Sequence, residues 1–301
     1  MSNTIVGPDC SYTNLQYLSE GDYGQVVSGV QEPGGRLIAI KKINKKQNAV
    51  RIATEILAGQ RLKNVEGVVP FRTHFETSNH HWLVFDFAPG HDLYHSMAES
   101  EFRPMHERVV RVILSQLATA LGKIHEKGVA HKDIKLENVI WDNVERKASF
   151  IDFGLCVLDK EFSTDYAGSK EYAAPELLAG TGPYCPKRAD VWALGVTIFA
   201  LLFGVFPFSY KEDNFSLEAP SFPDHIKVPP EAADLLSKML EFNAAKRIDI
   251  QGILAHKFMK KGSTRMPIMT PRSPTLGSPR ALSCHGSRST SPIHDLAPAS
   301  L

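Results

Sequence analysis

The sequence has little that points to a secreted, membrane-bound or nucleic-acid-binding protein. Its 301 residues include only four cysteines, and these lie far apart without a C-x-x-C pair or a metal-ligand spacing. We therefore expect free thiols in a reducing compartment and a cytoplasmic location with access to the nucleus. The polar first ten residues lack the apolar core of a signal peptide. The net charge of only +1 predicts neither a nucleic acid nor an anionic membrane as partner.

Long apolar runs are scarce as well. One stretch, residues 191–208, is almost long enough to be mistaken for a membrane span. Asp190 precedes this stretch and Pro207 interrupts its end. These two residues favour a buried core helix over a transmembrane segment.

Aromatic residues are absent from residue 262 onward, where Ser, Thr, Pro, Gly and Arg dominate. Such a segment cannot bury enough apolar surface to offset the entropy lost on ordering, so we expect residues 261–301 to form a disordered tail. It is either a plain solvated tail or a target of proline-directed kinases. Its Ser/Thr-Pro pairs are Thr270-Pro271, Ser273-Pro274, Ser278-Pro279 and Ser291-Pro292.

The remaining chain reads as strands first and helices later. Short apolar runs joined by tight turns predict an antiparallel meander, which a helix and two further strands follow. The predicted strands are 15–18, 25–30, 37–43, 69–75 and 82–87, and the predicted helix is 48–62. After a hinge-like Ala88-Pro89-Gly90, helices are predicted at 107–127 and 231–240, with a hairpin near 139–151.

This order predicts an α+β fold with two lobes. A small antiparallel β lobe with one helix occupies residues 12–87, and a larger, mainly helical lobe occupies residues 88–260. Residues 1–11 form an N-terminal extension.

A glycine-bearing turn between two strands is the first chemical motif. It runs from Leu18 to Val26 and contains Gly21 and Gly24. Glycine lets the backbone approach phosphate oxygens without a Cβ in the way. A Rossmann glycine turn would open a helix instead. Alone, the pattern is also explained by a simple hairpin turn.

A lysine inside an apolar strand is the second motif. Lys41 follows Ile38-Ala39-Ile40, and burying its ammonium is costly unless a carboxylate pairs with it. Glu55 on the following predicted helix is the natural partner. Together they could hold a cation against nucleotide phosphates. A surface lysine on an edge strand is the alternative.

The strongest motif is His131-Lys132-Asp133-Ile134-Lys135-Leu136-Glu137-Asn138, followed by Asp152-Phe153-Gly154. Phosphoryl transfer needs a carboxylate for the hydroxyl proton, oxygen ligands for Mg²⁺ and a cation that neutralises the moving charge. Asp133 suits the first task, Asn138 and Asp152 the second, and Lys135 the third.

With these motifs, residues 12–260 resemble the eukaryotic serine/threonine protein kinases, and most closely the calmodulin-dependent and AMP-activated branch. Ala174-Pro175-Glu176, Asp190 and Arg247 also match family positions. The resemblance implies that Arg247 pairs with Glu176 and that Asp190 braces the backbone around Asp133. The resemblance implies a bilobal kinase that transfers the γ-phosphate of ATP with Mg²⁺, with Asp133, Lys135, Lys41 and Glu55 as catalytic residues and Asn138 and Asp152 as metal ligands. It implies a nucleotide site formed by Leu18, Gly21, Gly24, Val26, Ala39, Lys41, Asp86, Ala88, Asp92 and Ile140.

The same resemblance implies further roles. Phe85 matches the residue that guards the adenine pocket, and Ser169 matches a hydroxyl that bridges Asp133 and Lys135. The implied partners are proteins bearing serine or threonine, and the kinase itself is expected to be monomeric. Glu137 and Asp92 either favour basic residues before the target hydroxyl or serve only the fold and the nucleotide.

The sequence departs from the family pattern at four positions. Ser19 replaces a loop glycine, which weakens nucleotide binding without abolishing activity. Lys132 replaces an arginine that grips an activation-loop phosphate, and Asp165 stands at the usual phosphorylated position. A permanent carboxylate there predicts basal activity, with Ser163 and Thr164 as alternative phosphorylation sites. Gly59 leaves a gap beside Glu55 that Phe71 and Phe85 could fill.

Two other protein classes compete with this interpretation. A pseudokinase scaffold binds nucleotide or partners without turnover, and it predicts the loss of one of the four central residues Lys41, Asp133, Asn138 and Asp152. All four are present. A small-molecule phosphotransferase shares the aspartate and the metal site but usually lacks the Ala-Pro-Glu element.

Overall fold

The computed structural model describes residues 4–21, 24–180, 182–208, 220, 222–223 and 228–260. Two predictions fall outside these residues: the disordered tail at 261–301 and the tip of the glycine-bearing turn at 22–23. The first compact unit ends at Lys260, so the fold below is that of the unit before the predicted tail.

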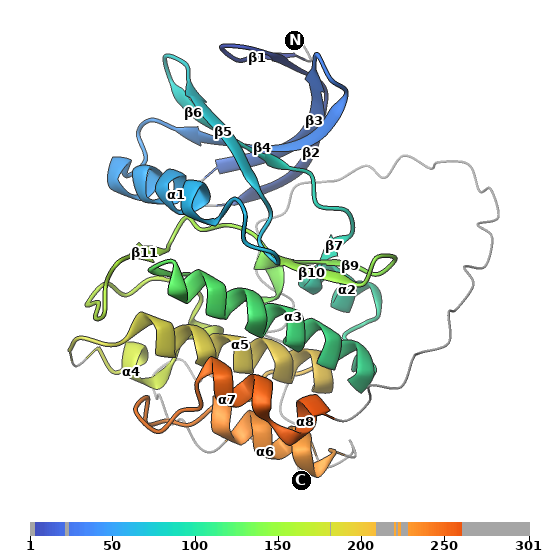
Figure 1. Ribbon diagram of the computed structural model, residues 1–301, viewed down its shortest axis with the longest axis vertical. Helices are drawn as coiled ribbons and strands as arrows, with labels where there is room; N and C mark the ends of the chain where they lie inside the picture. Colours follow the sequence, from blue (N-terminus) through green and yellow to red (C-terminus); the bar gives the residue numbers. More distant parts are fainter. Residues whose placement is uncertain are drawn as a thin grey trace, which may run out of the picture. The chain divides into compact units, whose positions relative to one another are not determined.

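A six-stranded antiparallel sheet forms the small lobe (Figure 1). Its order is β1-β2-β3-β4-β6-β5. The strands are β1 Ile5–Val6, β2 Ser11–Gly21, β3 Gly24–Glu32, β4 Arg36–Asn44, β5 Phe71–Glu76 and β6 His80–Asp86. β1 pairs with β2 through Ile5 and Tyr12, so part of the predicted N-terminal extension belongs to this sheet.

Helix α1 (Ala49–Leu62) of the small lobe packs on one face of the sheet. Asn48 caps its N-terminus by accepting hydrogen bonds from the backbone N–H groups of Val50 and Arg51, which would otherwise lack partners. Because side chains alternate along a strand, the two faces of the sheet carry separate clusters. Ile43, Leu83, Phe71 and Ile52 pack on the α1 side, and Tyr12, Ile38, Ile40, Phe75 and Val84 pack on the other.

The large lobe is mainly helical. Its principal helices are α2 Leu93–Glu99, α3 Glu107–Glu126, α4 Pro175–Leu178, α5 Pro186–Phe203, α6 Pro230–Met239, α7 Ile250–Ala255 and α8 Lys257–Lys260. Short strands lie at its upper edge, below the small lobe (Figure 1). They are β7 His91–Asp92, β8 Val129–Ala130, β9 Val139–Asp142, β10 Lys147–Phe150 and β11 Val157–Leu158. The predicted α+β fold with two lobes is therefore confirmed.

The apolar run at 191–208 forms most of α5, the central helix of the large lobe. Nearly all of its residues are buried, including Trp192 and Phe199, and they pack against α3 and α6. Burial all round explains why the run carries apolar residues on every face instead of one stripe. No helix in the described part of the chain combines the length and the hydrophobicity needed to cross a membrane.

Candidate active site

Lys41 on β4 pairs with one carboxylate from each lobe. Its Nζ donates to Glu55 Oε1 of α1 at 2.7 Å and to Asp152 Oδ1 of the large lobe at 2.7 Å. The side chains of Lys41 and Glu55 are only 8% and 4% exposed. The strand lysine is therefore buried and paired, as its apolar surroundings require.

This triad shifts the pKa values of its members. Burial lowers the pKa of the Lys41 ammonium, but the charges of Asp152 and Glu55 outweigh burial and the net shift is upward. Burial raises the pKa of Asp152, yet Lys41 and the Gly154 N–H overcome it and bring the pKa down to about 2. At neutral pH the site therefore presents an ionised Asp152 beside a charged Lys41.

Asp133 lies at the centre of a second group. Asn138 Nδ2 donates to Asp133 Oδ2 and to its backbone carbonyl, each at 2.8 Å. Lys135 Nζ lies 3.1 Å from the same Oδ2 and donates to Ser169 Oγ at 3.2 Å. The carboxylate is thus fixed beside a cation, the arrangement that the sequence predicted for a proton acceptor.

Ser169 fulfils only half of its expected role. The described hydrogen bonds join its hydroxyl to Lys135, and none joins it to Asp133. The expected bridge is therefore wrong on the aspartate side. Ser169 instead positions Lys135, which itself contacts the carboxylate.

Asp190 braces the backbone of this catalytic segment, as the resemblance implied. Its two carboxylate oxygens accept from the N–H groups of His131 and Lys132, both at 2.8 Å. Lys132 has a φ of 66°, which is unfavourable for a residue with a Cβ. His125 Nε2 also lies 2.8 Å from Asp190, a partner that the sequence did not suggest. Three contacts on one buried carboxylate therefore hold the turn that presents Asp133.

The Asp152-Phe153-Gly154 segment is held in a similar way. Asp152 has a φ of 58°, and its Oδ1 accepts from the Gly154 N–H at 3.0 Å. Phe153 is buried, and its ring centroid lies 4.6 Å from that of His131. The His131 ring nitrogen contacts the Ile151 carbonyl at 3.1 Å. The two chemical segments thus pack on each other through His131.

The predicted adenine-pocket residues share one face of the small-lobe sheet. Val26 pairs with Lys41 and Ala39 pairs with Phe85. Ala39 and Lys41 are two residues apart on β4, so these side chains project from the same face. Gly24 has a φ of 152°, and a Cβ at this position would collide with the Lys42 carbonyl, so the turn requires glycine here. Leu18 is 45% exposed at the end of the sheet.

Asp86, one of the predicted nucleotide-site residues, is the last residue of β6. The Asp86 carboxylate is held by Arg72 and by Arg36, and its N–H donates to the Pro70 carbonyl at 2.9 Å. The sequence did not suggest either arginine, because each lies on a distant strand.

Asp92 and Ile140 face each other across the β7–β9 ladder of the large lobe. One carboxylate oxygen of Asp92 caps α2 by accepting from the His95 N–H at 2.7 Å. Ala88, another residue of the predicted nucleotide site, lies in the segment between β6 and β7. The structure thus places the predicted contacts on both lobes and the segment that joins them.

Phe71 fills the space that Gly59 leaves beside Glu55. A Cβ at Gly59 would lie 2.7 Å from Phe71 Cγ, and the Phe71 ring packs edge-on against Phe85 with centroids 5.5 Å apart. The expectation that Phe71 occupies the gap is confirmed, and Phe85 supports the Phe71 ring from the side instead of entering the gap itself. α1 therefore packs closely enough on the sheet to hold Glu55 at Lys41.

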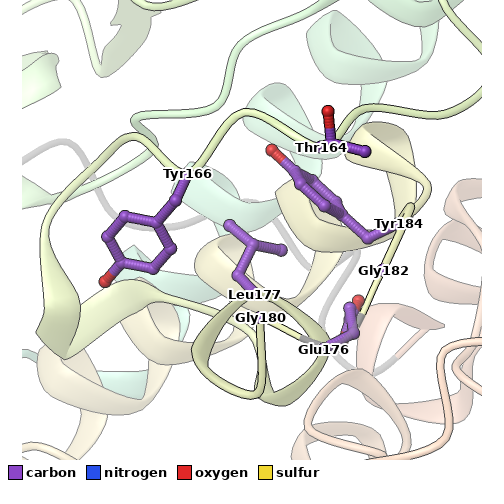
Figure 2. A pocket seen from close by; sticks show the side chains of 7 residues that line it. All are labelled: Thr164, Tyr166, Glu176, Leu177, Gly180, Gly182 and Tyr184. Carbon is purple, nitrogen blue, oxygen red and sulfur yellow. The ribbon is translucent and has the colours of Figure 1, made fainter.

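The segment after Asp152 is tied to Lys132. Lys132 Nζ lies 3.1 Å from Asp165 Oδ2 and donates to the Asp165 carbonyl at 3.0 Å. Ser163 is buried, and its backbone exchanges two 2.9 Å hydrogen bonds with Tyr184. Thr164 is exposed at the rim of a cavity of about 290 Å³ whose wall includes Leu177 (Figure 2). The Asp165 carboxylate, at the position where the resemblance predicts a phosphorylated residue, therefore lies within ion-pair distance of Lys132.

A buried arginine anchors the end of this segment. Arg247 is only 2% exposed, and its guanidinium binds both carboxylate oxygens of Glu176 at 2.8 Å. Two parallel charge-assisted bonds fix both distance and orientation. The predicted Glu176–Arg247 pair is therefore present.

Comparison with known proteins agrees with this geometry. The family model described as protein kinase domain matches residues 12–259. NUAK family SNF1-like kinase 2 of Rattus norvegicus is 32% identical, covering 85% of this chain and 41% of its own. Hormonally up-regulated neu tumor-associated kinase homolog A of Xenopus laevis is 34% identical over 83% and 38%. Serine/threonine protein kinase ypkA of Aspergillus fumigatus is 31% identical over 81% and 40%.

The chain thus spans about two fifths of the length of these curated relatives. The SNF1-like relatives confirm the predicted likeness to the AMP-activated branch. With the family model covering most of the sequence and the predicted residues gathered around Lys41 and Asp133, the chain belongs to the protein kinase domain family.

Proposed function

We propose that this chain is a serine/threonine protein kinase that transfers the γ-phosphate of ATP to protein hydroxyls. One observation supports this most directly. The Asp133 carboxylate is fixed by Asn138 and Lys135, while Lys41 is fixed by Glu55 and Asp152. The proton acceptor and the phosphate-binding cation are thus each positioned before any substrate arrives.

Asp133 would orient the substrate hydroxyl and accept its proton, because Asn138 and Lys135 hold its carboxylate in place. Lys135 would stabilise negative charge on the transferred group. Burial lowers the pKa of its ammonium, but Asp133 raises it more, so the cation persists at neutral pH. Ser169 keeps this ammonium next to the carboxylate.

The residues present fit Mg²⁺. Asn138 uses its amide nitrogen on Asp133, and Asp152 uses Oδ1 on Lys41 and Gly154. The described hydrogen bonds leave Asn138 Oδ1 and Asp152 Oδ2 without a protein donor, and oxygens of this kind are the ligands that Mg²⁺ prefers. When bound, the ion would neutralise charge on the phosphates, and Lys41 would add its charge from the small lobe.

ATP would lie between the lobes, against the sheet face that carries Val26, Ala39 and Phe85. Backbone groups of Asp86 and Ala88 would contact the adenine, and Asp92 and Ile140 would line the site from the large lobe. Gly21 and Gly24 support close approach of the small-lobe turn to the phosphates. Leu18 would cover the adenine from the end of β2.

We propose that the kinase has basal activity without loop phosphorylation. The Asp165 carboxylate already occupies the neighbourhood of Lys132, where a phosphate would otherwise form the ion pair. Ser163 is a poor modification site because its side chain is buried and accepts from the Asp165 N–H at 3.2 Å. Thr164 remains accessible, so its phosphorylation would have a secondary effect on activity.

Basic residues upstream of the target hydroxyl would suit the acidic pair Glu137 and Asp92. Glu137 is exposed, and Tyr172 donates to its Oε2 at 3.4 Å. Asp92 keeps one carboxylate oxygen beyond its α2 cap. A peptide-library screen tests this preference, and equal rates for basic and neutral upstream residues would contradict it.

We also propose that the chain acts as a monomer in the cytoplasm, with access to the nucleus. The wide spacing of its cysteines and the free thiols of Cys10, Cys156 and Cys185 support a reducing compartment. Sedimentation tests the monomer, and imaging of the full chain tests its location.

The experiment that tests the activity compares wild type with Asp133→Ala. Both proteins receive radiolabelled ATP, Mg²⁺ and peptides that offer serine, threonine or tyrosine. We expect label on serine and threonine with wild type and almost none with the variant. Equal labelling by both proteins would contradict the proposal. Tight ATP binding without transfer by wild type would favour a pseudokinase scaffold instead.

A further inference from the structure

We propose that His74, Glu76 and His81 form a binding site for one transition-metal ion, with Zn²⁺ the best match, on the β5–β6 hairpin of the small lobe. These residues are separate from the phosphoryl-transfer site. Neither the predicted kinase mechanism nor the packing of α1 uses them.

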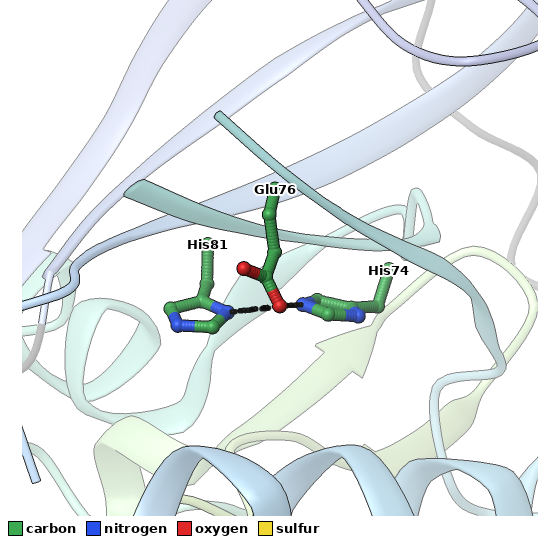
Figure 3. A group of neighbouring side chains, drawn as sticks. All are labelled: His74, Glu76 and His81. Atoms are coloured by element: carbon green, nitrogen blue, oxygen red, sulfur yellow. Dashed lines mark hydrogen bonds and ion pairs between the residues drawn. The ribbon is translucent and has the colours of Figure 1, made fainter. Parts of the chain in front are cut away.

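The hairpin register brings the three side chains together. Glu76 and His81 are direct partners across the antiparallel β5–β6 pair, and His74 lies two residues before Glu76 on the same strand. Because side chains alternate along a strand, all three project from one face. Figure 3 shows the two imidazole rings turned toward each other with the Glu76 carboxylate between them.

The distances match those of a metal site. His74 Nε2 lies 3.1 Å from His81 Nδ1, and Glu76 Oε1 lies 3.5 Å from His81 Nδ1 and 3.9 Å from His74 Nε2. A point equidistant from these three atoms lies about 2 Å from each, which is the length of a zinc–nitrogen or zinc–oxygen bond. The ligand atoms therefore need to move little to accept an ion.

The chemistry of the three groups also suits zinc. Two imidazoles with one carboxylate are a common zinc ligand set, and water would complete the coordination. The His74, His81 and Glu76 side chains are 22%, 17% and 47% exposed, so an ion can reach them from solvent.

Lys45 positions the carboxylate for this role. Its Nζ lies 2.6 Å from Glu76 Oε2, which leaves Oε1 turned to the imidazoles. The Lys45 N–H donates to the Asn79 carbonyl in the hairpin turn at 2.9 Å. Partners of this kind orient metal ligands. The bound ion would therefore fasten the hairpin beside the loop that leads from β4 into α1.

A simpler account explains part of the same geometry. The 3.1 Å contact is also an imidazole–imidazole hydrogen bond between rings that stack with centroids 5.4 Å apart, and Lys45–Glu76 is also a surface ion pair. This account predicts no affinity for metal ions. A direct measurement of binding separates the two.

The test titrates the full chain, freed of metal with a chelator, with Co²⁺ and follows visible absorption. We expect a band of four-coordinate Co²⁺ that saturates at a single ion per chain and disappears when Zn²⁺ is added. Cysteine thiolates would add ultraviolet charge-transfer bands, so their contribution is recognised separately. The melting temperature should rise with Zn²⁺, because the ion binds the folded state.

Three variants sharpen the result. His81→Ala should weaken the affinity for Co²⁺, read from the visible titration, by more than about 100-fold. Glu76→Gln, which changes a half-exposed ligand, should weaken this affinity by about tenfold. His80→Ala is the matched control, because the His80 ring packs toward Trp82 with centroids 5.9 Å apart. Circular dichroism without metal establishes that each variant is folded. A wild type without the band, or a Glu76→Gln variant that binds as wild type does, would overturn the proposal.

Discussion

Lys41 and Lys132 are both buried near the catalytic segment, yet their carboxylate partners differ. The Lys41 side chain is 8% exposed and pairs with Glu55, which is 4% exposed. The Lys132 side chain is 1% exposed, but its partner Asp165 is 61% exposed. Solvent screens the second pair far more than the first. The first pair therefore belongs to the fixed machinery, whereas the second can be altered at moderate cost.

The largest effect is expected for Lys41→Met. The substitution leaves the buried Glu55 without its cation, which typically costs about 3–5 kcal/mol of unfolding free energy. It also removes the predicted phosphate contact, so transfer should fall by more than about 100-fold. Urea unfolding and radiolabel transfer measure the two losses.

Lys42→Met is the control for this variant. Lys42 is the next residue on β4, and its ammonium lies 5.6 Å from the centroid of the Trp82 ring on the opposite face of the sheet. We expect nearly wild-type transfer. A loss equal to that of Lys41→Met would show that charge on β4, and not the triad, sustains activity.

Asp165→Ala should have a smaller effect. The exposed carboxylate contributes about 1 kcal/mol or less to stability, and Lys132 keeps its bond to the backbone carbonyl at residue 165. Transfer should fall by about fivefold to tenfold, the equivalent of about 1 kcal/mol. Initial rates measure this, with Thr164→Ala as the exposed neighbouring control. A fall as large as that of Lys41→Met would remove the distinction between the two lysines.

The acid behaviour of Asp152 tests the fixed character of the first site. Its folded-state pKa of about 2 is below its ordinary value of 3.8, so its ionised form stabilises the fold. This stabilisation is fully present at pH values above the ordinary pKa of 3.8, and it is lost as pH falls through about 2. Carboxyl NMR should show Asp152 still ionised in the folded protein at pH 4 and a raised pKa in Lys41→Met. An Asp152 that titrates above pH 4 in wild type would contradict the triad.

The smallest effect on transfer is expected for Gly59→Ala. Its Cβ would meet the Phe71 ring at 2.7 Å, and such crowding typically costs about 1–3 kcal/mol. Better helix propensity returns up to about 1 kcal/mol. We expect a net loss of about 1 kcal/mol and slightly lower transfer, measured by thermal unfolding and initial rates.

Gly122→Ala in α3 is the control, because its Cβ would contact only Ile250 at 3.2 Å. It should be neutral or stabilising. A Gly59→Ala protein more stable than wild type would show that Phe71 does not confine α1.

Local chemistry made much of the fold and the site predictable. The predicted helix 48–62 matches α1 to within one residue, and the apolar run after Asp190 marked α5, because apolar spacing and apolar content act within one segment. Lys41, Asp133 and Asp152 were predicted from motifs whose residue types are set by phosphoryl transfer. That these three side chains lie close together could therefore be inferred from the sequence alone.

Contacts set by long-range register were not predictable in this way. Arg72 and Arg36 reach Asp86 only because three strands pair in one order, and His125 reaches Asp190 only because α3 packs against α5. The short strand β1 also escaped prediction, because two residues carry no periodic signal. The expected Ser169–Asp133 hydrogen bond was wrong for a related reason. The motif predicts that Ser169 lies near Asp133 and Lys135, but not which of the two its hydroxyl contacts.

The most direct test is the initial rate of label transfer to a serine/threonine peptide by the full chain, after mass spectrometry has established that it carries no phosphate. We predict transfer from the first time point, with no lag, because the chain's own carboxylates and lysines already assemble the site. Silence until another kinase modifies Thr164 or Ser163 would contradict a preassembled site.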